Sequence, residues 1–429
     1  MTTNSDPTAL RPRPLGLCSA VALIVASMIG TGVFTTSGFL LADLGSRHAV
    51  LTVWAAGGVV ALLGALSYGA LARRLPESGG EYLFLSRTLH PAAGYVAGWI
   101  SLLVGFSAPL AAAAVGFGEY TSHWWPQFAP RATGTALIVL FGAIHCVHVQ
   151  RGAWVQNAAV LVKLALLLMF VGFGAARLAG PMPEPASAPA PLSAFGLALV
   201  WVSFSYSGWN AAVYIGGEIR DPERNLPRSL VIGTAVVTLL YVALNAVFVF
   251  SAPVATLSGQ LEVGRIAAQA LGGVGCAEAV TALIALALAT SVSSLVMTGP
   301  RVYARMAADG TVPQWLKTGV GPPRAAIALQ VAVSSAMVWT ATYESLLTYI
   351  GFTLGLSTAA TVAALMVLRR REGPCVHVPG WPWVPGAFVL VVLATTALAL
   401  QLRPAASLAG LGTIALAWLA WTVQRRIEK

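Results

Sequence analysis

The chain has 429 residues, of which 57% are hydrophobic and only 9% are charged. Soluble domains carry about 25% charged residues, so this composition excludes an ordinary water-soluble enzyme, a disordered chain and a disulfide-rich secreted module. The net charge of +10 would suggest nucleic-acid binding in a soluble protein, but in a membrane protein it is first a signal of topology. The four cysteines stand singly, without the spacing of a metal site or a disulfide framework.

Long apolar segments fill almost the whole chain. A helix that spans a bilayer needs about 20 mostly apolar residues, and the sequence predicts twelve such helices in an all-α integral membrane protein. In chain order, the predicted spans cover residues 15–41, 49–72, 80–118, 132–150, 153–177, 191–219, 228–252, 274–306, 323–342, 346–369, 382–402 and 405–424. The first apolar segment is too long for a cleaved signal peptide, so we expect the N-terminus to stay attached. Residues 256–271 are predicted to form a short amphipathic helix on the outer surface.

The basic residues indicate the orientation of the chain. With an even number of spans both termini lie on one side of the membrane, and alternating loops then place most Lys and Arg residues on that side. The loops of the other side keep only Arg47, Arg131, Arg177, Arg265 and Arg403. The positive-inside rule therefore predicts cytoplasmic tails at 1–14 and 425–429. We expect a multi-pass plasma-membrane protein, in the inner membrane of a bacterial cell, that contacts the lipid bilayer and no nucleic acid.

Two predicted spans are interrupted by small residues near their middles. The first carries Gly30 and Gly32 on either side of Thr31, and a glycine costs about 1 kcal/mol in a helix interior. Close packing of helices explains a single such pattern, but the sixth span repeats it at 203–210, where Ser-Phe-Ser-Tyr-Ser-Gly-Trp-Asn lies mid-span. Paired interruptions five helices apart are typical of an inverted repeat with a binding site at the midplane.

The positions of the two interruptions predict how the chain is divided. Helices one to five, residues 15–177, and helices six to ten, residues 191–370, form a five-plus-five inverted repeat in this interpretation, with helices one and six discontinuous. A Pro- and Ala-rich linker at 178–190 joins the two halves outside the cell, and residues 382–424 add two C-terminal helices. No soluble domain is expected.

The chemistry of a broken helix indicates the kind of ligand. Unwound backbone is tolerated at membrane depth only where it lines a cavity. The N–H groups that open the second half-helix suit a carboxylate, and the carbonyl groups that end the first half-helix suit an ammonium group. Such a pair of groups fits the head of an α-amino acid. The predicted substrate-binding residues are Ser27, Met28, Ile29, Gly30, Thr31, Gly32, Phe204, Ser205, Tyr206, Ser207, Gly208 and Asn210.

Three further motifs, together with the Gly-Thr-Gly break at 30–32, resemble those of the amino acid–polyamine–organocation family. They are Leu-Pro-Glu-Ser-Gly-Gly-Glu-Tyr-Leu-Phe-Leu at 75–85, Gly-Glu-Ile-Arg-Asp-Pro-Glu-Arg-Asn-Leu-Pro-Arg at 217–228 and Arg-Val-Tyr-Ala-Arg-Met-Ala-Ala-Asp-Gly-Thr-Val-Pro at 301–313. The resemblance implies a LeuT-type fold and an amino acid transporter rather than an enzyme, without a cofactor. It also implies that Phe204 is an aromatic gate over the substrate. The charged residues of 217–228 are interpreted as inner-gate ion pairs and helix caps, not as ligands.

Lys163 is the one ionisable residue that the sequence places near the bilayer midplane. A charge at that depth costs at least about 2.5–3.5 kcal/mol on insertion scales and is by default a functional residue. Its side chain is too short to reach either interface, so its expected partners are the carbonyl groups of the broken first helix. The resemblance implies that this ammonium group takes the place of a bound sodium ion. We therefore expect sodium-independent transport, with Lys163 and Phe204 in gating or coupling roles.

The remaining residues favour a neutral amino acid as the substrate. No acidic residue falls near the middle of a predicted span, where a cationic amino acid or polyamine would need one. No base other than Lys163 is available there for a second carboxylate. Ser291 and Ser294 are predicted to contact the substrate or the gate, and Ser107 is a further candidate.

Several alternatives stay open at this stage. A cationic amino acid or polyamine antiporter and an amino acid exporter belong to the same class, and proton-linked transport or uniport competes with exchange. A channel would need a filter sequence or a ring of charge, and a membrane enzyme would need a nucleophile with a base, or a metal cluster. His145 and His148 lie three residues apart but have no third ligand nearby, so they are interpreted as interfacial residues and no metal is expected. The sequence predicts no oligomeric state.

Overall fold

The computed structural model describes residues 15–147, 152–178, 190–310, 312–317 and 322–427. The predicted N-terminal tail, nearly all of the linker at 178–190 and residues 428–429 lie outside this part of the chain. The α-helices are α1 (Leu17–Met28), α2 (Gly32–Leu44), α3 (Arg47–Arg74), α4 (Gly80–Thr88), α5 (Pro91–Ile100), α6 (Ala108–Thr121), α7 (Pro130–Val147), α8 (Gly152–Arg177), α9 (Leu192–Ser205), α10 (Pro222–Phe250), α11 (Val254–Leu257), α12 (Val263–Ala308), α13 (Arg324–Thr340), α14 (Tyr343–Glu372), α15 (Trp383–Leu402) and α16 (Pro404–Ile427). The π-helix η1 (Ser101–Ser107) joins α5 to α6, and the short 3₁₀-helices are η2 (Ala211–Glu218), η3 (Gln314–Leu316) and η4 (Gly373–Cys375).

Most of these helices are long and apolar enough to cross a membrane. In the described part of the chain eight helices meet that description, namely Arg47–Arg74, Pro91–Thr121, Pro130–Val147, Pro222–Phe250, Val263–Ala308, Tyr343–Glu372, Trp383–Leu402 and Pro404–Arg426. A ninth span results if α1 and α2, which meet at a bend of 45°, are counted together, while α9 and α13 are apolar but shorter. The predicted class, an all-helical membrane protein, is confirmed.

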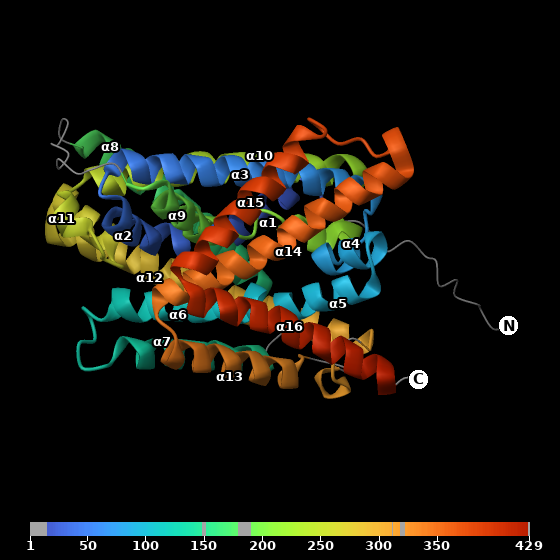
Figure 1. Ribbon diagram of the computed structural model, residues 1–429. Helices are drawn as coiled ribbons and strands as arrows, with labels where there is room; N and C mark the ends of the chain where they lie inside the picture. The colour runs from blue at the N-terminus through green and yellow to red at the C-terminus, as the bar shows by residue number, and fades with distance from the viewer. Residues whose placement is uncertain (1–14, 148–151, 179–189, 311, 318–321, 428–429) are drawn as a thin grey trace.

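The long helices lie roughly along one axis, so the molecule has two ends (Figure 1). At one of them, the basic end, α3, α14 and α16 finish in arginine residues, and the chain also enters α1 there. An ion pair of 2.7 Å between Arg74 and Glu372 joins α3 to α14 at this end. At the opposite end, Arg403 pairs with Glu344 at 3.2 Å and thereby joins the turn between α15 and α16 to α14.

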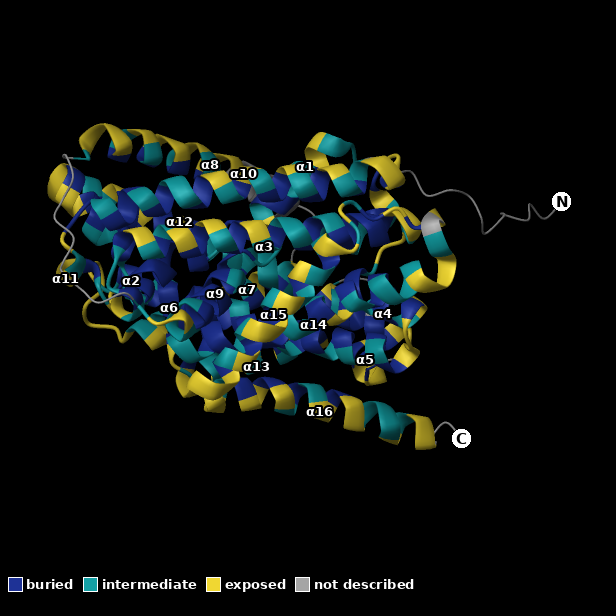
Figure 2. Cartoon of the chain, turned by 45° about the horizontal axis from the view of Figure 1, so that its top comes forward, coloured by how far each residue is buried: buried dark blue, intermediate teal, exposed yellow. Residues whose placement is uncertain are grey.

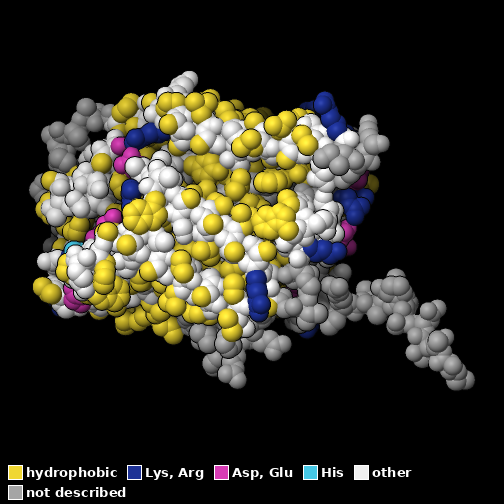
Figure 3. All heavy atoms as spheres, turned by 90° about the horizontal axis from the view of Figure 1, so that it is seen from below, with side chains coloured by type: hydrophobic (Ala, Val, Ile, Leu, Met, Phe, Trp, Pro, Cys, Tyr) yellow, Lys and Arg dark blue, Asp and Glu magenta, His cyan; other side chains and the backbone are white. Residues whose placement is uncertain are grey.

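Apolar side chains cover much of the outer surface. Buried residues lie on the inner faces of the helices, whereas many residues of α8 and α16 are exposed on the outside (Figure 2). The exposed side chains on these two helices include Leu161, Met169, Leu416 and Trp418. On the face drawn in Figure 3, hydrophobic side chains form a broad field and charged ones lie mainly toward its two ends. An apolar surface of this extent fits hydrocarbon and not water.

Two elements differ in detail from their predictions. The predicted span 80–118 is divided, because α4 ends at Thr88 and a new helix begins at Pro91. A proline disfavours helical backbone at the residue before it and fits the first turn of the next helix. The helix predicted within 256–271 is present from Val263 onward, and Gly273, with φ 72°, separates it from the long apolar part of α12.

Candidate functional site

The first helix breaks at the predicted glycines. α1 ends at Met28, the backbone leaves the helical conformation at Ile29 (ψ 84°), and α2 begins at Gly32. The N–H of Gly30 turns back to the carbonyl oxygen of Met28, at 2.8 Å. The first N–H groups of α2 stand where a helix has no partner of its own and carries a partial positive charge. The break therefore presents donors for an anion.

The sixth predicted span is also broken. α9 ends at Ser205, residues 206–210 form turns, and the chain continues as η2. Gly208 has φ 98°, a backbone conformation that favours glycine over any residue with a side chain. The hydroxyl of Tyr206 donates to the carbonyl oxygen of Trp54 on α3 at 2.9 Å and fixes the turn against that helix.

The two breaks touch each other. A Cβ atom on Gly32 would lie 2.7 Å from the Cα of Ser205, and a Cβ atom on Gly208 would lie 2.8 Å from the carbonyl oxygen of Ser27. Such distances are too short for real Cβ contacts, so only glycine permits this approach at either position. The two interruptions, which lie far apart in the sequence, thus form one crossing point.

A cavity of about 450 Å³ lies at this crossing point. Its lining includes every predicted binding or gating residue except Ile29 and the further candidate Ser107, namely Ser27, Met28, Gly30, Thr31, Gly32, Lys163, Phe204, Ser205, Tyr206, Ser207, Gly208, Asn210, Ser291 and Ser294. Ser107 does not line it, and its hydroxyl instead donates to the carbonyl oxygen of Leu102 at 3.0 Å. The lining residues of α1 precede the break, and those of α12 continue to Val302, so the cavity extends from the breaks toward the basic end.

Lys163 of α8 reaches the first break. Its side chain is buried, and its Nζ donates to the carbonyl oxygen of Ile29 at 2.7 Å, which is the kind of contact that the sequence predicts for it. Without this donor, the carbonyl would be an unpaired acceptor at membrane depth. Tyr241 of α10 holds the adjacent carbonyl of Met28 through its hydroxyl group. Two neighbouring helices therefore fix the shape of the break.

Glu81, which the sequence did not single out, lines the same cavity and is only 4% exposed. Its Oε1 accepts from the hydroxyl of Tyr68 at 3.0 Å and from the amide of Asn210 at 2.5 Å, and its Oε2 accepts from the hydroxyl of Tyr214. The amide nitrogen of Asn210, a predicted substrate contact, is thus bonded to protein. Two signals were available for Glu81, a carboxylate at the edge of the predicted span 80–118 and its place in the motif at 75–85.

Toward the opposite end, polar side chains of α2 close the space beyond the breaks. The hydroxyl of Thr36 pairs with that of Ser205 at 3.1 Å, and Thr35 pairs with Tyr343 of α14 at 2.5 Å. The hydroxyl of Ser37 donates to the side-chain amide oxygen of Asn245 on α10, at 2.5 Å. The three α2 residues are fully buried. α2 is therefore fixed to three helices, α9, α10 and α14, beyond the breaks.

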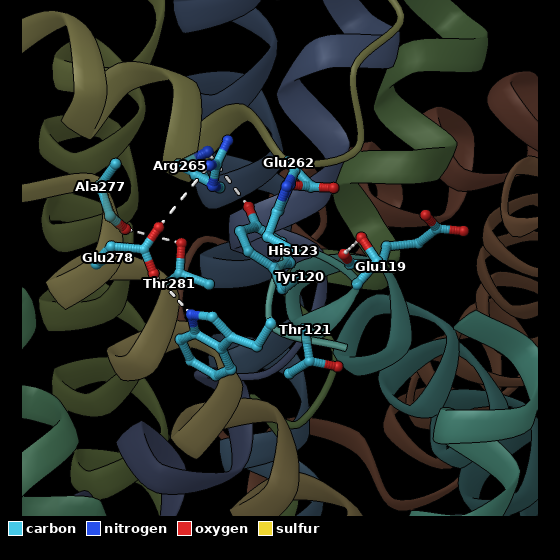
Figure 4. Close-up of polar contacts among 12 residues, drawn as sticks. Glu119, Tyr120, Thr121, His123, Glu262, Arg265, Ala277, Glu278 and Thr281 are labelled. Atoms are coloured by element: carbon cyan, nitrogen blue, oxygen red, sulfur yellow. Dashed lines mark hydrogen bonds and ion pairs between the residues drawn. The ribbon is translucent and has the colours of Figure 1, made fainter. Parts of the chain in front are cut away.

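A second layer of polar contacts lies farther toward the opposite end (Figure 4). Tyr120 of α6 donates to the carbonyl oxygen of Phe34 at 2.8 Å and accepts from the N–H of Gly264 at 3.2 Å. His123, just after α6, contacts Glu262, just before α12, at 2.6 Å. These contacts tie α2, α6 and α12 together at the closed end of the cavity.

The cavity offers binding groups: backbone N–H and carbonyl groups at the two breaks, hydroxyl groups, one carboxylate and one ammonium group. Among the described residues, no group of three or more His, Cys, Asp or Glu side chains is placed to hold a metal ion. His145 contacts the hydroxyl of Ser293 at 3.1 Å, and His148 lies outside the described residues.

The fold and this site define a class, a helical membrane protein with a polar cavity between two broken helices. Comparison with known proteins then identifies the family. The family model described as amino acid permease matches residues 15–421. The chain therefore belongs to the amino acid permease family, as the motifs implied, and it is a transporter of amino acids rather than an enzyme.

Three relatives illustrate the similarity. The serine/threonine exchanger SteT of Bacillus subtilis (strain 168) is 25% identical over 385 residues, which are 87% of this chain and 88% of SteT. The large neutral amino acids transporter small subunit 2 of Rattus norvegicus is 29% identical over 377 residues, 84% of this chain and 70% of the relative. The human b(0,+)-type amino acid transporter 1 is 31% identical over 244 residues, 54% of this chain and half of the human protein.

Proposed function

We propose that this protein exchanges neutral amino acids across the plasma membrane by alternating access, without sodium. The N–H groups around Gly32 bind the α-carboxylate, and carbonyl groups at the ends of α1 and α9 bind the α-ammonium group. Phe204, buried on α9 at the cavity wall, covers the substrate. The observation that carries the proposal is the contact between the breaks at Gly32 and Ser205, because it brings the groups for both ends of a zwitterion into one cavity.

The names of the relatives support exchange and a neutral substrate. SteT is a serine/threonine exchanger, and another relative is a transporter of large neutral amino acids. Serine and threonine carry no net charge, so a cavity that accepts them needs no further ionic partner. The hydroxyl groups that line this cavity, including those of Ser291 and Ser294, are suitable contacts for a small polar side chain.

The proposed membrane layout has twelve spans. It adds α8, α13 and the broken segment of α9 and η2 to the nine spans of the described chain. Residues 15–177 and 191–370 then form the five-plus-five inverted repeat, with the basic end in the cytoplasm and the protein in the inner membrane of a bacterial cell. The arginine residues at the ends of α3, α14 and α16 support this orientation.

Lys163 makes sodium unnecessary in this proposal. Its ammonium group holds the carbonyl oxygen of Ile29, a group that would otherwise be available to a cation. Movement of α1 breaks or remakes this contact, which gives Lys163 a coupling role during opening and closing.

Uptake into vesicles that contain the purified protein tests the proposal. We expect labelled serine, threonine or another neutral amino acid to enter faster when the vesicles are preloaded with unlabelled neutral amino acid. Replacement of sodium by choline should leave the rate unchanged. A rate that is indifferent to preloading would contradict exchange, and loss of uptake in choline would contradict sodium independence.

One observation favours a second candidate, a cationic amino acid or polyamine antiporter. Glu81 places a carboxylate on the cavity wall, which the distribution of acidic residues in the sequence did not lead us to expect. The same vesicles distinguish the two functions. Uptake of arginine or a polyamine, with no uptake of neutral amino acids, would support this second candidate and contradict the first.

A further inference from the structure

The charges on the cavity wall balance each other. Among the described residues that line the cavity, Glu81 is the only carboxylate and Lys163 the only basic side chain, and their charges have opposite signs. They come from different helices, α4 and α8. Glu81 contacts Asn210 in the break that follows α9, called the second break, and Lys163 contacts Ile29 in the first break. The two helix ends at the first break add partial charges of opposite sign, which also cancel. The lining as a whole is therefore electrically neutral.

Within the part of the chain that the structure describes, neither side chain has an ion-pair partner. The partners of Glu81 are two tyrosine hydroxyls and one amide, and the partner of Lys163 is a backbone carbonyl. All of these partners are uncharged. Hydrogen bonds to uncharged partners leave the net charge of each side chain in place. Each side chain therefore remains a fixed charge that a bound substrate experiences through a medium of low polarity.

We propose that Glu81 determines the charge selectivity of the cavity. Its negative charge compensates Lys163, so that a substrate of zero net charge is bound and amino acids with an additional anionic or cationic side chain are rejected. This inference rests on the proposed transport of neutral amino acids and identifies the residue that limits the site to them. Glu81 acts at a distance on the whole cavity and also positions Asn210 of the second break.

The physical reason is the cost of a net charge in a buried site. A charged group taken from water loses its hydration and is retained only if the site supplies an opposite charge. With Glu81 ionised, an anionic substrate side chain interacts with one positive and one negative group, so the two electrostatic contributions to its binding free energy largely cancel. Without Glu81, the lining has a net charge of one positive unit, and an anionic side chain would be favoured while a cationic one would be repelled.

Two isosteric pairs of amino acids test the unmodified protein first. Glutamine and glutamate, and asparagine and aspartate, have nearly the same shape and differ by one charge. We expect the neutral member of each pair to bind at least about tenfold more tightly, measured by competition with a labelled neutral substrate in vesicles. Lysine should compete as poorly as glutamate.

Glu81→Gln then removes the charge while keeping the size and planarity of the side chain. In this variant we expect the ratio of glutamate to glutamine affinity to rise about tenfold. Glu77→Gln is the matched control, because Glu77 lies at the same end, is largely exposed, and pairs with Arg87 outside the cavity. Its ratio should stay at the wild-type value, as should that of Glu81→Asp, which keeps the charge.

The outcomes are distinguishable. Equal affinity for glutamine and glutamate in the wild-type protein would overturn the inference even if Glu81→Gln failed to fold. A folded Glu81→Gln variant with the wild-type ratio would also overturn it, as would an equal rise in the Glu77→Gln control. Failure of every neutral amino acid to compete in the wild-type protein would instead contradict the proposed function itself.

Discussion

At the scale of single residues, the site depends as much on two glycines, which have no side chain, as on the groups that bind. Gly32 and Gly208 let two backbone segments approach within contact distances that a Cβ atom would prevent. Lys163 then bonds to the backbone carbonyl of Ile29 at the first break, and Glu81 bonds to the side-chain amide of Asn210 at the second. A glycine at each crossing and one buried charge beside each break are therefore the minimal components of the cavity.

The glycines of the first break are not equivalent. A Cβ atom at Gly32 would strike the backbone of Ser205, whereas a Cβ atom at Gly30 would have only the carbonyl oxygen of Met28 nearby, at 3.8 Å. We therefore expect Gly32→Ala to destabilise the fold by about 1–3 kcal/mol, the usual cost of overpacking. The measurement is the thermal midpoint of the purified protein. Gly30→Ala is the matched control, and an equal loss in both variants would contradict the steric explanation.

The sequence revealed these glycines but not Glu81. Gly30 and Gly32 are visible because glycine is costly in a helix and because the pattern recurs in the sixth span. Glu81 is bonded to Tyr68, Asn210 and Tyr214, which come from three other segments. Partners that meet only in the folded chain leave no local pattern, so a side chain of this kind is found only by structure.

At the scale of elements, the ends of helices need partners in a protein with little water around it. Arg47 opens α3, yet its side chain is buried and serves α10. Its guanidinium group donates to the carbonyl oxygens of Val249, at 2.8 Å, and Ala252, at 3.2 Å. Val249 lies in the last turn of α10 and Ala252 just after its end, where a helix leaves acceptors unpaired. The positive-inside pattern places this arginine in an outer loop, but in the structure its side chain caps the end of α10.

Removal of this cap should be costly. Arg47→Ala leaves two carbonyl groups without their charged donor, and a hydrogen bond to a charged group contributes about 1.5–3 kcal/mol. We expect a clear fall in the thermal midpoint of the purified protein. Arg131→Ala is the control, because Arg131 is exposed and its hydrogen bond to the carbonyl oxygen of Trp339 is longer, at 3.3 Å. Equal midpoints for the two variants would show that the buried contacts of Arg47 contribute nothing.

The contacts of α2 with α6 and α12 should control opening toward the opposite end. Tyr120→Phe removes the hydroxyl that bridges Phe34 and Gly264, and one such hydrogen bond has a net value of about 0.5–1.5 kcal/mol. An equilibrium between closed and open conformations that depends on one such hydrogen bond shifts by about two- to tenfold when the bond is removed.

The shift in this equilibrium can be measured by cysteine labelling. A chain without other cysteines carries Ser291→Cys, and the rate at which this thiol reacts with an impermeant reagent is measured in intact cells. We expect faster labelling with Tyr120→Phe. Tyr349→Phe, which loses a hydroxyl contact with Thr413, is the control. Equal rates in both variants would contradict a role for Tyr120 in opening.

At the scale of the whole molecule, the sequence predicted the class well and the layout less completely. Apolar length and composition were sufficient for an all-helical membrane protein. They were insufficient for the division of 80–118, because the apolar segment of α5 was extended back through α4, which carries Glu81 and Arg87 and ends before Pro91. The kink of α12 at Gly273 is a similar case, since a single glycine in an apolar segment has several possible meanings.

The distribution of charge makes an independent prediction about orientation. Arginine residues end α3, α14 and α16, whereas the opposite end carries Glu262, Glu278 and Glu344 as well as basic residues. The positive-inside rule depends on this difference in Lys and Arg near the membrane, so the basic end should face the cytoplasm.

Native Cys375 allows a direct test of that orientation, because it is exposed and follows α14 at the basic end. In a chain that keeps only this cysteine, an impermeant maleimide should label intact cells weakly and permeabilised cells strongly. The matched chain has no native cysteines and carries Thr256→Cys on α11, at the opposite end, where the side chain is exposed. It should react before permeabilisation. The reverse pattern would place the basic end outside and would show that the arginine residues do not determine the topology of this chain.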